Sequence, residues 1–253
     1  MPIQDPRLSI GSVAGARAGA PAIDQGLRAF MLAVYNHMAI GVALTALAAL
    51  GTFVLATGSA DGTVATLTPF GQLIYGSPLK FVVMFAPIGL VLWMSFGAGR
   101  MSSSGARALF YVFSAAMGVS LSAIFLIYAH GSIVRVFAVT AATFGALSLY
   151  GYTTKRDLSG FGSFLTMGLF GLVIASVVQA IFPTPGLSFL IPVAGVLIFA
   201  GLTAWNTQML KSMYLGAGSA EEGEKLAIFG ALNLYMDFVN LFLSLLQLLG
   251  DRR

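Results

Sequence analysis

A stripe of small and polar side chains follows one face of the segment from residue 226 to residue 250. Its members recur at intervals of three and four residues, the spacing of a single helical face: Gly230, Asn233, Asp237, Asn240, Ser244 and Gln247. Asp237 is the one charged residue in the segment. A deprotonated Asp237, with the amide oxygens of Asn233 and Asn240, offers hard oxygen ligands suited to Ca²⁺. One carboxylate makes such a calcium site weak and transient, and the same carboxyl can also bind a proton.

A purely structural reading of the stripe is a polar zipper, in which amide and hydroxyl groups bond across helices and donors pin the carboxyl. Simple zippers rarely need an ionisable group, so Asp237 favours function over the zipper. Asn206 and Arg100, taken alone, carry no such signal. Asn206 fits a helix end or interhelical bonding, and Arg100 fits a side chain that extends toward lipid headgroups.

Composition decides which kind of protein positions this stripe. Charged residues are 9% of the 253 residues, against roughly 25% in soluble domains, and hydrophobic residues are 58%. This excludes a soluble enzyme and a nucleic-acid-binding protein, despite a net charge of +4. The chain has no cysteine and only two histidines, and it contains no HExxH or P-loop motif. We therefore expect an all-α polytopic membrane protein that is not an enzyme.

Long stretches without charge locate the membrane spans, because a helix needs about 20 apolar residues to cross the hydrocarbon core. The segment before them, residues 1–27, is small and polar and predicts a disordered cytosolic tail. Residues 28–253 then form a seven-transmembrane-helix bundle. The predicted spans are about 30–57, 81–99, 108–128, 131–151, 160–182, 187–210 and 226–250.

The orientation follows from the distribution of lysine and arginine. With the N-terminus in the cytosol, the outside segments hold Arg135 and Lys80, two basic residues. The inside segments hold nine: Arg7, Arg17, Arg28, Arg100, Arg107, Lys155, Arg156, Lys211 and Lys225. The length of the last segment predicts that it crosses fully, which places Arg252 and Arg253 outside.

The position of Asp237 constrains the last helix. It lies about 16 Å from Leu226 along a helix, near the middle of the membrane. An aspartate there costs about 2.5 to 3.5 kcal/mol on insertion scales if it faces lipid. We therefore expect the last helix to be central in the bundle, with its stripe turned away from lipid.

Three segments resemble the Bax inhibitor family, also called transmembrane Bax inhibitor motif proteins. They are GALSLYGYTTKRDL (145–158), WNTQMLK (205–211) and GALNLYMDFVNLFLSLLQLLG (230–250), and the similarity covers roughly residues 28–253. The absence of cysteine and the short loops suggest a bacterial member in the inner membrane. The resemblance implies a seven-helix bundle in which the other six helices surround the last one.

The resemblance also implies a function, that of a pH-sensitive calcium leak channel. In such proteins the proposed sensor is a pair of aspartates on helices six and seven, with a latching arginine at the end of helix two. By motif, these positions correspond to Asn206, Asp237 and Arg100, so Asn206 stands where the family usually has aspartate. Asn206 cannot ionise, but it can donate to Asp237 or offer its carbonyl to Arg100. We expect altered rather than absent pH dependence.

Calcium would be the permeant ion, and no cofactor is implied. We expect the protein to be a monomer surrounded by membrane lipid, and we expect it not to bind nucleic acid. Two other functions stay open. Some bacterial relatives are thought to modulate a membrane-bound protease through the N-terminal tail, which would make the chain a regulatory protein. Asp237, together with a weak repeat between residues 145–150 and 230–235, also fits a proton-coupled secondary transporter.

Overall fold

The computed structural model describes residues 11–58, 66–97, 100–216 and 219–253, and the side chains from residue 25 onward apart from that of residue 220. These residues form an all-α bundle with one isolated β-bridge. The elements are α1 (Gly11–Thr57), α2 (Pro69–Gly71), the π-helix η1 (Gln72–Gly76), α3 (Leu79–Gly97), α4 (Ser103–Leu121), α5 (Ile124–Ile127), α6 (His130–Thr153), α7 (Ser159–Ile181), α8 (Pro185–Leu215) and α9 (Ala220–Leu249).

Seven helical segments in the described part of the chain are long and apolar enough to cross a membrane. They are Gln25–Thr57, Leu79–Gly97, Ser103–Ile127, His130–Thr153, Ser159–Ile181, Pro185–Leu215 and Glu221–Leu249. Each coincides with one of the spans predicted from the missing charges. The structural helices extend further at several ends, because a helix continues past the hydrocarbon boundary while its backbone bonds remain satisfied.

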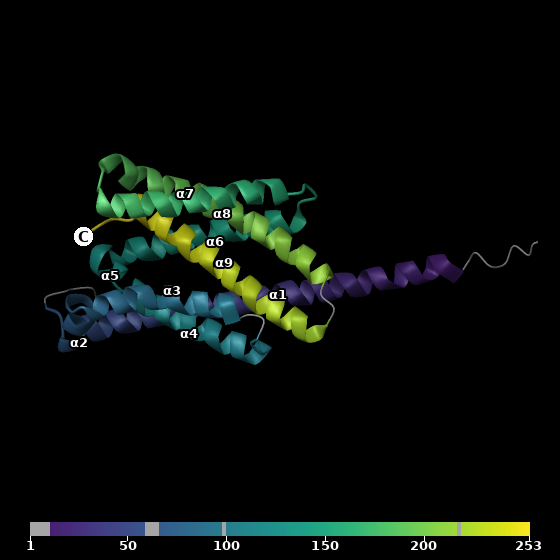
Figure 1. Ribbon diagram of the computed structural model, residues 1–253, viewed down its shortest axis with the longest axis horizontal. Coiled ribbons are helices and arrows are strands. Elements are labelled where there is room, and N and C mark those ends of the chain that lie inside the picture. Colours follow the sequence, from purple (N-terminus) through teal and green to yellow (C-terminus); the bar gives the residue numbers. More distant parts are fainter. Residues whose placement is uncertain (1–10, 59–65, 98–99, 217–218) are drawn as a thin grey trace, which may run out of the picture.

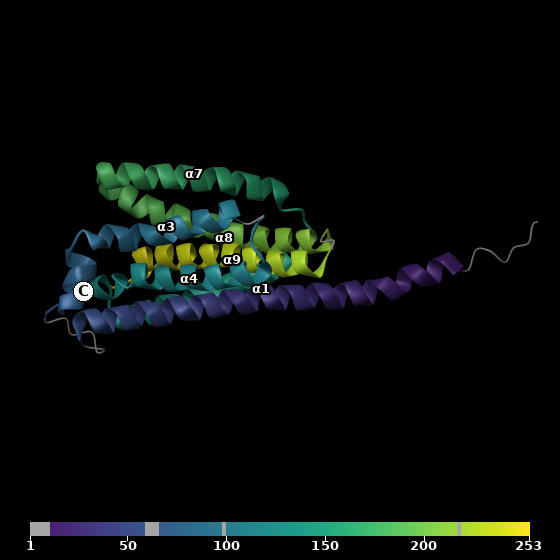
Figure 2. The same ribbon diagram turned by 60° about the horizontal axis from the view of Figure 1, so that its bottom comes forward.

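Helix α1 corrects the prediction for the N-terminal segment. The helix begins at Gly11, so residues 11–27 are helical and the prediction of disorder is wrong for them. Residues 1–10 lie outside the described part. Figures 1 and 2 show the N-terminal part of α1 running well beyond the other helices as a single rod.

Helix α9 is central, as the polar stripe predicts. In its most apolar stretch 67% of the residues are buried, against 33% or less in the other six spans. It packs mainly against α1, α4, α6 and α8. Helix α3 lies chiefly on α4, and α7 chiefly on α8 (Figure 2). The last helix is thus enclosed chiefly by four neighbours rather than equally by six, and α3 and α7 form an outer layer.

Two close helix crossings hold this arrangement together. Gly118 of α4 lies against the backbone of α1, where an added Cβ would be 2.4 Å from the carbonyl oxygen of Thr45. Gly151 of α6 meets α8 in the same way, with an added Cβ 2.2 Å from the carbonyl oxygen of Ala204. In a membrane, such contacts replace the hydrophobic effect as the force between helices.

The two ends of the bundle differ in charge. We call the end where α9 begins the basic end, because it carries Arg28, Arg100, Arg107, Lys155, Arg156, Lys211 and Lys225. The opposite end, where α9 finishes, is the far end. There the chain after α9 bonds to the turn between α5 and α6: the Ala129 amide donates to Asp251, and the Arg253 amide donates to Ile127. Helix α9 therefore crosses the whole bundle, as its length predicts.

Candidate ion and proton site between α8 and α9

Three members of the polar stripe of α9, Gly230, Asp237 and Ser244, face α8, whereas Asn233 and Gln247 are exposed. An added Cβ at Gly230 would lie 2.5 Å from the side chain of Leu210, and one at Gly195 of α8 would lie 2.5 Å from the Ser244 hydroxyl. Asp237, midway between Gly230 and Ser244, bonds to Asn206 of α8. The spacing of small and polar residues on α9 therefore creates a seam along which the two helices come close, and it keeps Asp237 away from lipid.

Asp237 and Asn206 form the centre of the site. The Asn206 amide Nδ2 donates to the Asp237 carboxyl Oδ2 at 2.6 Å. Both side chains are buried, with 5% and 8% of their surfaces exposed. The structure therefore brings together the two residues that were singled out on different helices.

Asp237 has no cationic partner among the described residues. The ion pairs in that part of the chain are Arg107–Glu224, Arg135–Asp251 and Lys225–Glu221, all with partly exposed side chains. No group of three His, Cys, Asp or Glu side chains gathers within the described ranges. The site thus offers one carboxyl and neutral amides, which suits a proton or a weakly held cation rather than a resident metal ion.

Asn233 and Asn240 do not bond to Asp237. Asn240 is half-buried, and its amide donates to the Met236 carbonyl of the same helix at 2.8 Å. Asn233, one turn nearer the basic end, is exposed, and no hydrogen bond of its side chain occurs among the described residues. Both lie on the helical face of Asp237, so they flank the carboxyl without holding it.

Arg100 lies apart from this centre. It follows α3 at the basic end, is exposed, and its backbone amide donates to Gly97. Within the described ranges, no hydrogen bond or ion pair joins its side chain to Asp237 or Asn206. Of the two interactions open to Asn206, the structure contains the one with Asp237 and lacks the one with Arg100.

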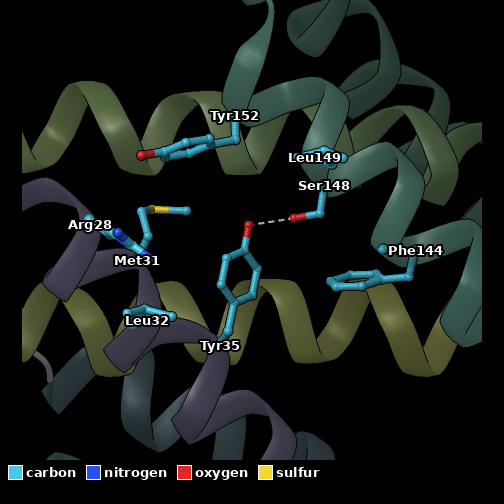
Figure 3. Close-up of a pocket in the computed structure, with 9 residues that line it drawn as sticks. Arg28, Met31, Leu32, Tyr35, Phe144, Ser148, Leu149 and Tyr152 are labelled. Atoms are coloured by element: carbon cyan, nitrogen blue, oxygen red, sulfur yellow. Dashed lines mark hydrogen bonds between the residues drawn. The ribbon is translucent and has the colours of Figure 1, made fainter. Parts of the chain in front are cut away.

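A chain of hydroxyl groups lies next to the site and was not predicted from the sequence. The Tyr35 hydroxyl of α1 lies 2.6 Å from the Ser148 hydroxyl of α6, and Ser148 lies 3.0 Å from the Thr207 hydroxyl of α8. Figure 3 shows the first of these bonds spanning the gap between α1 and α6. Because Thr207 follows Asn206 directly, the chain leads to the neighbourhood of the buried carboxyl. A threonine adjoining Asn206 was the available signal, but only the fold reveals its partners.

On the far-end side of Asp237, aromatic rings pack between α6 and α9. Phe137 of α6 contacts the rings of Phe238 and Phe242 of α9, with centroids 5.5 and 6.1 Å apart. These rings line a cavity of about 90 Å³ that also involves α1 and the short helix α5. Aromatic rings therefore fill the contact between α6 and α9, while Asn240 and Ser244 continue the face of α9 that carries Asp237 toward the far end.

Comparison with known proteins places the whole bundle in one family. The family model described as inhibitor of apoptosis-promoting Bax1 matches residues 27–253. An uncharacterized protein of Rickettsia prowazekii is 45% identical over 91% of this chain and 92% of its own length. The Escherichia coli K12 protein named inner membrane protein YbhL is 40% identical over 90% of this chain and 94% of its own length. An uncharacterized membrane protein of Streptococcus pyogenes is 32% identical over 90% of this chain and 94% of its own length.

Proposed function

The chain belongs to the Bax inhibitor family, and on that premise we propose that it is a pH-sensitive, calcium-permeable leak channel of a bacterial inner membrane. Asp237 is its cation site and its proton sensor. Seven apolar helices and the family membership support the membrane assignment. The nine-to-four excess of basic residues, with Arg252 and Arg253 counted outside, supports an orientation with the basic end and the N-terminus in the cytosol.

The observation that carries the proposal is the buried carboxyl of Asp237, which has no countercharge among the described residues. A charged carboxylate enclosed in a low-dielectric interior costs several kcal/mol unless a cation or several donors compensate it. Asn206 supplies one donor, at 2.6 Å from Asp237. The remaining charge is neutralised either by a proton or by a passing cation, and both bind the same oxygens.

Competition between proton and cation gives the pH dependence its sign. A protonated Asp237 is neutral and does not attract calcium, so flux falls as the pH falls. A deprotonated Asp237 binds calcium weakly through few oxygen ligands, and weak binding is what conduction requires. The Asn206 amide holds the carboxyl in place in both states.

The present arrangement supports a closed channel. Phe137 of α6 packs against Phe238 and Phe242 of α9, and in this proposal a calcium ion has to pass these rings. Hydrophobic constrictions of this kind close pores by excluding water. Opening then requires α9 to move relative to α6.

Calcium flux into liposomes containing the purified protein tests the proposal. Replacing Asp237 with asparagine (Asp237→Asn) keeps the shape of the side chain and removes its charge. We expect at least a tenfold loss of flux near neutral pH and a loss of its pH dependence, because the asparagine side chain at position 237 does not titrate.

Asp251→Asn is the matched control, since it removes a carboxyl just beyond α9 whose side chain is exposed and paired with Arg135. It should conduct like the wild type. If Asp237→Asn conducts as well as the wild type with the same pH profile, Asp237 has no part in the mechanism.

A second candidate function is supported by the length of α1. The helix extends to Gly11, beyond the bundle, as Figures 1 and 2 show. A projecting helix on the cytosolic side suits a regulatory protein that contacts a membrane-bound protease. Deletion of residues 1–24 separates the two functions. A channel conducts without this segment, whereas a regulator that acts through it loses its effect on the protease.

A further inference from the structure

A groove separates α1 from α6 near the basic end. It encloses about 550 Å³ and lies between two helices that make little direct contact with each other. Figure 3 shows its two walls, with α8 and α9 passing behind them. The wall residues that matter here are Arg28, Met31 and Tyr35 of α1 and Phe144, Ser148 and Tyr152 of α6.

The mouth of the groove is cationic. Arg28 is exposed at the end of the groove where the ring of Tyr152 also lies (Figure 3). The Lys211 ammonium of α8 donates to the Tyr152 carbonyl at 3.4 Å and lies 5.4 Å from the centre of its ring. Among the residues from 25 onward, whose side chains the structure describes, no acidic residue lines the groove. Arg28 therefore lines the mouth, and Lys211 lies beside it against Tyr152.

The body of the groove is apolar and open to the side. Leu32 and Leu149 on its rims are 59% and 63% exposed, on surfaces that face lipid in a membrane. Deeper in, Met31 and Phe144 are buried. The groove extends along α1 for the eight residues from Arg28 to Tyr35, a rise of about 10 Å. One group of donors lies along this length, the paired hydroxyls of Tyr35 and Ser148.

We propose that this groove is a binding site for one anionic glycerophospholipid. The phosphate lies between Arg28 and Lys211, an acyl chain follows the groove toward Phe144, and the Tyr35 and Ser148 hydroxyls face the ester carbonyls. From its basic end the groove presents Arg28, then the apolar side chains of Met31 and Leu32, then the hydroxyl pair of Tyr35 and Ser148, and finally Phe144 (Figure 3). It therefore offers a cation to the phosphate, hydroxyls to the ester region and apolar walls to an acyl chain. Basic pockets between membrane helices recognise lipid headgroups in this way.

The site does not depend on the proposed ion flux, because lipid binding is measured without it. It does adjoin the ion site: Ser148 bonds to Thr207, which follows Asn206 in α8. A lipid in the groove therefore touches the hydroxyl chain that ends beside Asn206 and Asp237.

Native mass spectrometry of the purified full-length protein tests the proposal. Phosphatidylglycerol and phosphatidylcholine with the same acyl chains are the probes. The wild type should bind one phosphatidylglycerol at least tenfold more tightly than phosphatidylcholine. The double variant R28Q/K211Q should lose that preference. Lys225→Gln removes a basic-end charge that pairs with Glu221 on α9, and it should keep the preference. The proposal is overturned if the wild type binds both lipids equally. It is also overturned if Lys225→Gln loses the preference for phosphatidylglycerol as fully as R28Q/K211Q does.

Filling the groove gives a second, steric test. A Cβ added at Gly145, which lines the groove, or at Gly171, which is exposed on α7, meets nothing within 4 Å. Gly145→Phe should abolish the tight binding of phosphatidylglycerol, and Gly171→Phe should retain it. Glycerol 1-phosphate should not displace the lipid; displacement would mean that the anion alone is recognised. A lipid-free dimer would mean that a second copy covers the groove, and it would also overturn the proposal.

Discussion

The Asn206 amide gives Asp237 a neutral hydrogen-bond partner in a position where a second carboxyl would fit. The two side chains already lie within 2.6 Å of each other and are both buried. An aspartate at position 206 would therefore share a proton with Asp237, because two adjacent carboxylates do not both ionise easily in a buried site.

This sharing predicts the effect of Asn206→Asp. We expect the pH at half-maximal calcium flux to rise by about one unit, since like charges favour the protonated form of the pair. Flux in liposomes measured from pH 5 to pH 9 reports the midpoint.

Gln247→Glu is the control for added charge. It places a carboxyl on the same stripe of α9, exposed near the far end, and it should leave the midpoint where it is. An unchanged midpoint in Asn206→Asp would contradict the role we assign to position 206.

At this scale the sequence singles out Asp237 and Asn206, which the structure brings together, and also Arg100, Asn233 and Asn240, which do not bond to that pair. It does not single out the hydroxyls. Asp237 stands out because an intramembrane carboxyl is rare, and Asn206 because of the motif around it. Tyr35, Ser148 and Thr207 come from three helices, and each hydroxyl alone is ordinary in a membrane helix. Their link appears only when the helices are packed.

At the scale of elements, close crossings position the helices that carry the site. Gly118→Leu would place a side chain where the Thr45 carbonyl of α1 now lies. Forcing a larger side chain into a packed contact costs typically about 1–3 kcal/mol. We expect a lower unfolding temperature in detergent and a faster loss of helical signal.

Gly89→Leu is the comparison, because Gly89 lies in the outer helix α3 and an added Cβ there meets nothing within 4 Å. Its unfolding temperature should stay near that of the wild type. If Gly118→Leu also unfolds near the wild-type temperature, the contact at Gly118 does not stabilise the packing of α1 against α4.

The beginning of α1 shows where element prediction fails. Residues 11–24 combine five alanines, which favour a helix, with three glycines and Pro21, which oppose it. Local propensities nearly cancel there, so composition predicted disorder. The structure continues the helix of the first span through this segment.

At the scale of the whole molecule, the seven spans were predictable because the hydrocarbon core fixes helix length and excludes charge. The outer position of α3 and α7 was not. Both are uniformly apolar segments, and an apolar helix packs against lipid or against protein equally well. Only for α9, whose intramembrane carboxyl has to be buried, did the sequence predict the place in the bundle.

The orientation of the bundle can be tested with single cysteines, because the chain has none. Gly160 begins α7 at the basic end and Gly186 begins α8 at the far end; both are exposed with free space around them. In intact cells, a membrane-impermeant thiol reagent should label Gly186→Cys and not Gly160→Cys.

Permeabilised cells provide the control, in which both cysteines should react. Labelling of Gly160→Cys alone in intact cells would reverse the orientation and place the basic end outside.

The central place of α9 has a consequence for how the protein is made. Synthesis proceeds from the N-terminus, so the other six spans enter the membrane before α9, the helix on which four of them pack. Until then, the faces of α1, α4, α6 and α8 that later enclose Asp237 have no partner. The insertion of α9 is therefore the step that completes the bundle, and a ribosome that stalls before residue 220 leaves a set of helices without a centre.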